Sequence, residues 1–296
     1  MQSIANAYYA LLSRANPARA LKLRALISDP KAMGFLGDTL QKLFARDALL
    51  SSRAFFRQNA ERVEHVLSLM ADEKSREAYR SLIQYRCYRK RRYINPHMQP
   101  KENSYLDREL VVPLEDEVFV DCGAYSGDSS LAFQAFCVSA GKPAPLCVLF
   151  EPEPANFTQL QKWLPEFERV PFLFQMGLWS KAGQLHFTPG LYTSSKIEEA
   201  GESSIEVDTL DHVLEGIPGL PPVTYIKIDV EGADLDALYG ARNTIERYRP
   251  RIAVAIYHND EHMIGIPEAI AEMCPAYRFF IRHYSSHDGE TVLYCL

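Results

Sequence analysis

The residues of this sequence best suited to chemistry are acids that stand where strand-like runs end. The first such run ends in Asp121 and opens into a loop that holds Gly123 and Gly127. A loop that binds a dinucleotide needs glycines at relative positions one, three and six, where this chain has Gly123, Tyr125 and Asp128. The tyrosine blocks a pyrophosphate and the aspartate repels it, so the loop favours a ligand without phosphates. A cationic ligand would suit its two acids.

A second strand-like run ends in Glu151, 28 residues after Gly123. In nucleoside-binding α/β folds, an acid at the end of the second strand accepts hydrogen bonds from the ribose hydroxyls. The alternative is an ordinary exposed acid before the turn residue Pro152. Together with the first loop, Glu151 predicts an adenosine-like ligand with a positive centre and no phosphate, and S-adenosylmethionine has these properties.

Charged residues alternate along a third run, where Lys227, Asp229 and Glu231 share one face of the expected strand. They gather at the strand end, which is where open α/β sheets bind ligands. Charges on a strand that is buried on both faces are costly unless they are paired or used. We therefore consider two roles for them, a structural ion pair and a part in the site.

Strands and helices alternate from about residue 105 onward, which predicts an α/β fold with a doubly wound, mostly parallel sheet. Strands are expected near residues 118–122, 146–151, 171–178, 223–229, 252–257, 277–283 and 291–295. Helices are expected near residues 128–139, 155–164, 233–247 and 260–273. Residues 183–207 interrupt the alternation, and their glycines predict an inserted set of short strands.

The N-terminal third differs from the rest of the chain in pattern and in charge. Apolar residues recur there at steps of three and four, which predicts several amphipathic helices. Residues 1–100 carry 18 basic and 8 acidic side chains, whereas residues 101–296 carry 14 and 30. We expect an N-terminal helical domain over 1–95, a linker over 96–112 and a ligand-binding domain over 113–296. The N-terminal helices could also support a homo-oligomer.

Basic and aromatic residues interleave over 85–93, which suits contact with nucleic acid, an anionic lipid surface or a phosphorylated substrate. The alternative is a solvated helix end, whose cations favour the C-terminus of the helix.

The six cysteines show no CxxC pairing and predict reduced, buried thiols. The sequence also shows neither a signal-peptide pattern nor an apolar run long enough to span a membrane, so we expect a cytoplasmic protein.

Five stretches of the chain resemble, in order and spacing, the FkbM-type S-adenosylmethionine-dependent methyltransferases. They are FVDCGAYSGD, FEPEPANF, VDTLD, YIKIDVEGADLDALYGA and RPRIAVAIYH. The resemblance covers about residues 110–296, and KIDVEGA is its most specific part. It implies a class I methyltransferase fold with a seven-stranded sheet. It also implies transfer of a methyl group, usually to an oxygen of a sugar, polyketide or other natural product.

The resemblance and the reasoning from the residues together predict which residues hold the donor and which act on the acceptor. The donor is expected to contact Asp121, Gly123, Tyr125, Gly127, Asp128, Glu151, Met176 and Gly177. Of these, the first loop would hold the methionine part, Glu151 the ribose, and the backbone around Met176 and Gly177 the adenine. The expected catalytic residues are Lys227, Asp229, Glu231 and His258, with Asp229 and Glu231 beside the transferred methyl group.

Methylation of an alcohol requires a base, and His258 and Asp229 are the candidates. His258 is favoured for its near-neutral reference pKa, although a structural histidine is the alternative. Many members of the family have an acid where this chain has Ala255, so no role is assigned to that position. His258 and His262 stand four residues apart around two acids, a spacing that a metal could use on a helix. Because no third ligand is evident, we predict no metal site.

Two other classes of protein fit parts of the sequence. A nucleic-acid methyltransferase would explain the basic N-terminal segment. However, the strand that carries Asp229 lacks the Asn/Asp-Pro-Pro-Tyr-like motif that holds a flipped base. A non-enzymatic scaffold that keeps a cofactor site only for stability need not retain Asp121, Glu151 and Asp229 together. We therefore expect an O-methyltransferase with a small-molecule acceptor.

Overall fold

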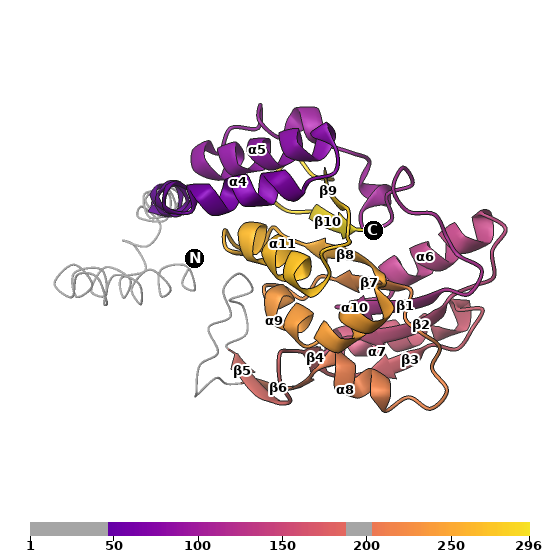
Figure 1. Ribbon diagram of the computed structural model, residues 1–296. Helices are drawn as coiled ribbons and strands as arrows, with labels where there is room; N and C mark the ends of the chain where they lie inside the picture. Colours follow the sequence, from indigo (N-terminus) through magenta and orange to yellow (C-terminus); the bar gives the residue numbers. More distant parts are fainter. Residues whose placement is uncertain (1–46, 188–202) are drawn as a thin grey trace, which may run out of the picture. The chain divides into compact units, whose positions relative to one another are not determined.

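The computed structural model describes residues 47–187 and 203–296, whose arrangement is shown in Figure 1. The helices predicted before residue 47 lie outside the described residues, and so does the stretch 188–202 of the predicted insertion. All six cysteines are free and buried, as expected. In the described ranges, no helix has both the length and the apolar character that crossing a membrane demands.

The chain divides into two units, of which the smaller comprises residues 1–58 with 86–89. In its described part, residues 47–58 are helical. Arg53 donates from Nε to the Cys87 carbonyl at 2.7 Å, and its guanidinium lies 4.7 Å from the centroid of the Tyr88 ring. The larger unit comprises residues 59–85 with 90–296.

The larger unit is built on a seven-stranded sheet with the strand order β3-β2-β1-β7-β8-β10-β9. The strand bounds are β1 Val118–Cys122, β2 Leu146–Phe150, β3 Phe172–Phe174, β7 Tyr225–Ile228, β8 Arg251–Ala255, β9 Phe279–His283 and β10 Thr291–Cys295. Neighbouring strands are parallel except β10, which is antiparallel to β8 and β9. The predicted doubly wound sheet of class I methyltransferase type, with helices N-terminal to it, is thus confirmed.

Helices connect the strands, and every residue of β1 and β7 is buried, as expected for parallel strands of an α/β fold. The α-helices are α4 Ala60–Leu69, α5 Glu73–Tyr88, α6 Asp128–Ser139, α7 Pro154–Lys162, α8 Leu210–Glu215, α9 Asp234–Tyr239, α10 Arg242–Tyr248 and α11 His262–Met273. Short 3-10 helices cover Asn95–His97, Lys101–Asn103 and Leu164–Glu166. A separate three-stranded sheet joins β4 (Gly177–Leu178), β6 (Ser203–Asp208) and β5 (Gly183–Phe187) in that order.

Two predicted elements are wrong in their extent. The single helix expected over 233–247 is two helices, since α9 ends at Tyr239 and Gly240 caps it. The glycine lets the Trp179 carbonyl oxygen approach to 2.1 Å from where a Cβ would stand. The carboxylate of Asp211 then caps the second helix by accepting from the N–H groups of Asn243 and Thr244. The single strand expected over 171–178 is likewise divided, between β3 and β4 of different sheets.

Within the larger unit, α4 packs on α11 (Figure 1) and α5 lies against the strand β9 side of the sheet. The Tyr79 hydroxyl donates to the Met263 carbonyl at 3.0 Å, and the Arg282 guanidinium pairs with Asp72 at 2.8 Å. Helix α5 ends at Tyr88, and the basic residues 89–92 that follow it are exposed. The division into domains at residues 95 and 112 stays a prediction.

Candidate active site at the ends of β1, β2 and β7

The loop after β1 is held by a buried charge network centred on Asp121. One carboxylate oxygen lies 2.7 Å from Lys227 Nζ, and the other accepts from the hydroxyls of Ser129 and Ser130 at 2.5 and 2.6 Å. Lys227 also donates to the Gly123 carbonyl at 2.8 Å. Burial lowers the pKa of Lys227, but Asp121 and the nearby Asp229 raise it above its usual range overall. The lysine is therefore a buried cation that joins β7 to the loop.

Two glycines give the loop its course beside β7. Gly123 has φ +87°, and a Cβ there would lie 1.9 Å from the Asp229 carbonyl oxygen. Gly127 has φ +88°, and a Cβ there would lie 2.7 Å from Leu160 Cδ1. Only glycine combines this backbone with these close approaches. Between them the exposed Tyr125 also has positive φ, and Asp128 is an exposed first residue of α6.

Glu151 follows β2 and is turned back toward the same loop. Its carboxylate accepts the N–H of Tyr125 and the N–H of Glu153, both at 2.9 Å. Burial raises the pKa of Glu151, and these hydrogen bonds oppose the rise. Its own N–H donates to the Phe174 carbonyl at the end of β3, just before Met176 and Gly177. Every residue predicted to bind the donor therefore lies at the carboxyl ends of β1, β2 and β3 or directly after them.

Asp229 is the first residue after β7, one position past the strand end. The Tyr105 hydroxyl donates to its Oδ2 at 2.8 Å, and the Tyr257 hydroxyl lies 3.4 Å from both of its oxygens. Burial raises the pKa of Asp229. Tyr105 also places its ring centroid 5.3 Å from Lys227 Nζ. The carboxylate of Asp229 thus contacts two phenol hydroxyls, and its backbone packs against the loop at Gly123.

His258 lies in the turn between β8 and α11, surrounded by acids. Its Nε2 is 3.4 Å from Asp229 Oδ1 and 3.6 Å from Glu231 Oε2, and its Nδ1 is 2.8 Å from Asp234 Oδ2. Burial lowers the pKa of His258, but the three carboxylates raise it above its usual value overall. Glu231 points outward, with 69% of its side chain exposed. The structure thus brings all four predicted catalytic residues into one region, with Lys227 engaged in the ion pair with Asp121.

Sequence reasoning missed three residues of this region. Tyr105 falls in the predicted linker and carries no local signal, since only the fold brings it to Asp229. Asp234 and Tyr257 stand inside the recognised motifs but received no role. The first ends the KIDVEGAD stretch and the second precedes His258, so both could have been flagged by their place beside predicted site residues.

The sequence-family model described as Methyltransferase FkbM domain matches residues 121–284, more than half of the chain. The chain belongs to the FkbM methyltransferase family. The resemblance based on the sequence motifs is thereby confirmed. The FkbM domain begins at Asp121 and includes Glu151, Asp229 and His258, so all the predicted site residues lie inside the matched region.

The individual proteins that this chain resembles are distant in sequence. The chain is 27% identical over 216 residues to Methyltransferase 1 of Beauveria bassiana, covering 62% of this chain and 77% of that protein. It is 26% identical over 135 residues to the hexuronic acid methyltransferase AglP of Haloferax volcanii, covering 45% and 53%. The crystal structure of methyltransferase FkbM from Methylobacillus flagellatus has a TM-score of 0.70 at 23% identity, covering 82% of this chain. The match spans 60% of that structure, less than two thirds of its length.

Proposed function

We propose that this protein transfers a methyl group from S-adenosylmethionine to a hydroxyl oxygen of a small, sugar-like acceptor. One observation carries the proposal: the loop expected to bind the donor packs directly on the acid expected to serve the acceptor. The position of a Cβ at Gly123 is only 1.9 Å from the backbone oxygen of Asp229. Membership of the FkbM methyltransferase family supports the class of reaction.

The residues around the loop fit the donor, which when bound supplies an electrophilic methyl group on a sulfonium. Gly123 and Gly127 let the loop backbone pack closely on Asp229 and Leu160, which holds the loop at the end of the sheet where the donor is expected. Glu151 keeps some acceptor capacity for the ribose, because its two oxygens offer about four lone-pair sites and accept three hydrogen bonds, from Tyr125, Glu153 and Asn156. Met176 and Gly177, just beyond β3, would line the adenine. Asp121 would act by fixing the loop, since both of its oxygens are already engaged.

On the acceptor side, Asp229 would receive the proton of the reacting hydroxyl. The Tyr105 hydroxyl, 2.8 Å from Oδ2, fixes the carboxylate, and His258 Nε2 approaches the other oxygen at 3.4 Å. A positioned base and a fixed alignment of the two reactants are what an in-line displacement requires from an enzyme. Lys227 would serve this arrangement through Asp121 and Gly123.

The acceptor class rests on charge and on one relative. AglP is named a hexuronic acid methyltransferase, which supports a sugar as acceptor. However, Asp229 and the exposed Glu231 make the acceptor side of this site acidic. A carboxylate on the sugar would be repelled there, so a neutral or amine-bearing sugar fits better.

The test separates the donor claim from the acceptor claim. Calorimetry with S-adenosylhomocysteine should show binding by the native protein and by Asp229→Asn. A panel of neutral, amine-bearing and carboxylated sugars with radiolabelled methyl donor should give product with the native protein, and about 100-fold less with Asp229→Asn. No binding of S-adenosylhomocysteine by the native protein would refute the donor. Full turnover by Asp229→Asn would remove that residue as the base.

A further inference from the structure

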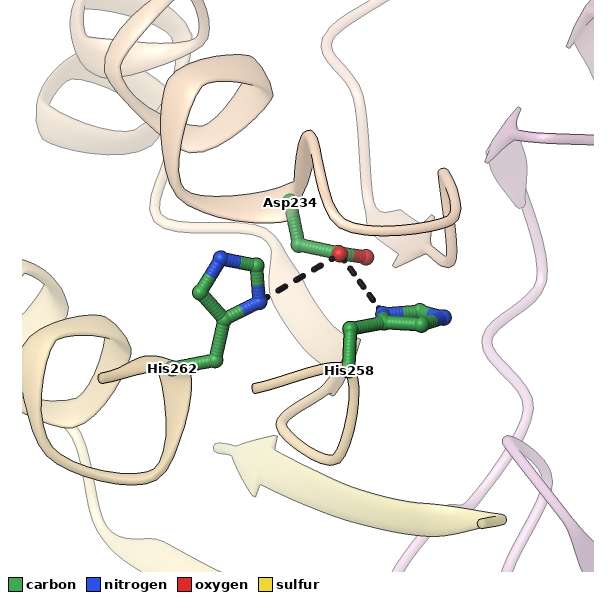
Figure 2. A group of neighbouring side chains, drawn as sticks. All are labelled: Asp234, His258 and His262. Carbon is green, nitrogen blue, oxygen red and sulfur yellow. Dashed lines mark ion pairs between the residues drawn. The ribbon is translucent and has the colours of Figure 1, made fainter. Parts of the chain in front are cut away.

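Two buried histidines face a single carboxylate oxygen behind the proposed active site, as shown in Figure 2. His258 Nδ1 lies 2.8 Å from Asp234 Oδ2, and His262 Nδ1 lies 3.5 Å from the same oxygen. The three ligand-type atoms all lie within 4.8 Å of one another. They come from the first residue of α9, the turn after β8 and the first residue of α11.

The Nδ1 atoms of the two histidines lack the full hydrogen bonding that buried polar atoms normally have. Among the described residues, His262 Nδ1 has no hydrogen-bond partner, and His258 Nδ1 has the ion-pair contact with Asp234 Oδ2 in place of one. The side chains of His258 and His262 are only 8% and 6% exposed, so solvent offers little compensation. Buried polar groups are nearly always satisfied, and an exception calls for a physical cause such as an ion.

Asp234, in contrast, is held rigidly in one orientation. Its side chain is fully buried, and its two oxygens accept the N–H groups of Val230 and Gly232, each at 3.0 Å. A carboxylate that binds a metal is commonly fixed in this way by outer hydrogen bonds. Asp234 also supplies the third ligand that the His258 and His262 spacing lacked in the sequence.

We propose that Asp234, His258 and His262 bind one divalent transition-metal ion of the zinc type. Bonds of about 2.0–2.1 Å to nitrogen and oxygen place the donors of a four-coordinate site roughly 3.3 Å apart. The observed separations of 2.8 and 3.5 Å lie on either side of this value. Two imidazoles with one carboxylate suit zinc or its neighbours and are a poor set for magnesium or calcium.

The charges of the region favour the same ligand. Asp229 and Asp234 are two acids held close to His258, whereas the nearby cation Lys227 is paired with Asp121. A cation bound beside Asp234 would offset this excess of negative charge. It would also join α9, α11 and the turn after β8, and leave the Nε2–H of His258 directed at Asp229.

The experiment measures metal binding without donor or acceptor, so its result is independent of the proposed methyl transfer. The full chain, without a histidine tag, is stripped with a chelator and titrated with Co²⁺, whose d–d absorption reports nitrogen ligation. Zinc content is then measured after reconstitution. The native protein should bind about one ion per chain, with a rise in melting temperature on Zn²⁺ that a chelator reverses.

His262→Ala should weaken Co²⁺ binding by at least about 100-fold, because loss of a ligand exceeds the usual effect of losing an outer hydrogen bond. The matched control is His65→Ala, which removes an exposed histidine on α4, outside the proposed site. This variant should bind metal like the native protein. Circular dichroism checks that each variant is folded. If His262→Ala does not fold, His258→Ala takes its place. The rise in melting temperature on Zn²⁺, and its reversal by a chelator, are measured on the native protein and test the proposal without any variant. Absence of Co²⁺ and Zn²⁺ binding by the native chain, or equal binding by a folded His262→Ala, would overturn the proposal and leave only the ion pair of His258 with Asp234.

Discussion

Replacement of Lys227 by methionine tests whether this lysine is a structural ion pair or a catalytic group. The Nζ atom contacts Asp121 Oδ1 at 2.7 Å and the Gly123 carbonyl at 2.8 Å, and both partners of the pair are almost completely buried. Removing one partner of a buried pair typically costs about 3–5 kcal/mol, because the other charge stays buried and unpaired. Ser129 and Ser130 still donate to Asp121, so we expect about 3 kcal/mol.

The assay is urea unfolding combined with calorimetry of S-adenosylhomocysteine binding. Lys227→Met should lower both the free energy of unfolding and the affinity, since the loop loses its anchor. Lys227→Met with Asp121→Asn should be less destabilised than the sum of the single variants, because no unpaired charge then stays buried. The exposed pair of Lys142 and Glu115 is the control, and Lys142→Met should change stability by at most about 1 kcal/mol. Native stability and affinity in Lys227→Met, with turnover lost, would refute the structural role and make Lys227 catalytic.

Three further changes test the loop, the ribose acid and the basic segment. Gly123→Ala should abolish binding of S-adenosylhomocysteine, because its Cβ would meet a backbone oxygen at 1.9 Å. The control is Gly141→Ala, at a position with φ +73° and open space around the Cβ. It should cost only about 1–2 kcal/mol of stability and keep native affinity. Glu151→Ala should weaken binding about 10- to 100-fold relative to the control Glu153→Ala. Because burial raises the pKa of Glu151, native affinity should also fall on acidification at a pH above 4.5, and the absence of this fall would argue against an ionised Glu151 as the ribose acceptor. Alanines at the exposed residues 89–92 should leave affinity unchanged, and a salt-sensitive loss of RNA or DNA binding would instead favour a nucleic-acid acceptor.

The sequence could predict the sheet because its strands are short apolar runs closed by acids or turns. β1 and β10 have the expected bounds, and so does helix α6. The boundary at Gly240 was missed although glycine is a local signal for a helix end. The sequence does not show, however, that the Trp179 carbonyl oxygen lies 2.1 Å from the position of the missing Cβ.

The candidate site could likewise be predicted only in part, because some of its residues are marked by their place in the sequence and others are brought in by tertiary packing. Acids at strand ends are visible in a sequence, since parallel strands end at one edge of a sheet, and Asp121, Glu151 and Asp229 do lie there. Their partners are not visible in this way. Tyr105 is 124 positions from Asp229, and only tertiary packing brings its hydroxyl to the carboxylate.

The turn after β7 explains how neighbouring acids come to have separate surroundings. Strand alternation would have placed Asp229 and Glu231 on one face, but the strand ends at Ile228 and the alternation ends with it. Glu231 and Gly232 then both take positive φ, at +54° and +103°, which reverses the backbone within three residues. As a result Asp229 faces the two phenols beside the donor loop, while the buried Asp234 faces the histidines. Because His258 contacts both acids through opposite nitrogens, any group that fixes its Nδ1 at Asp234 also fixes what its Nε2 presents to Asp229.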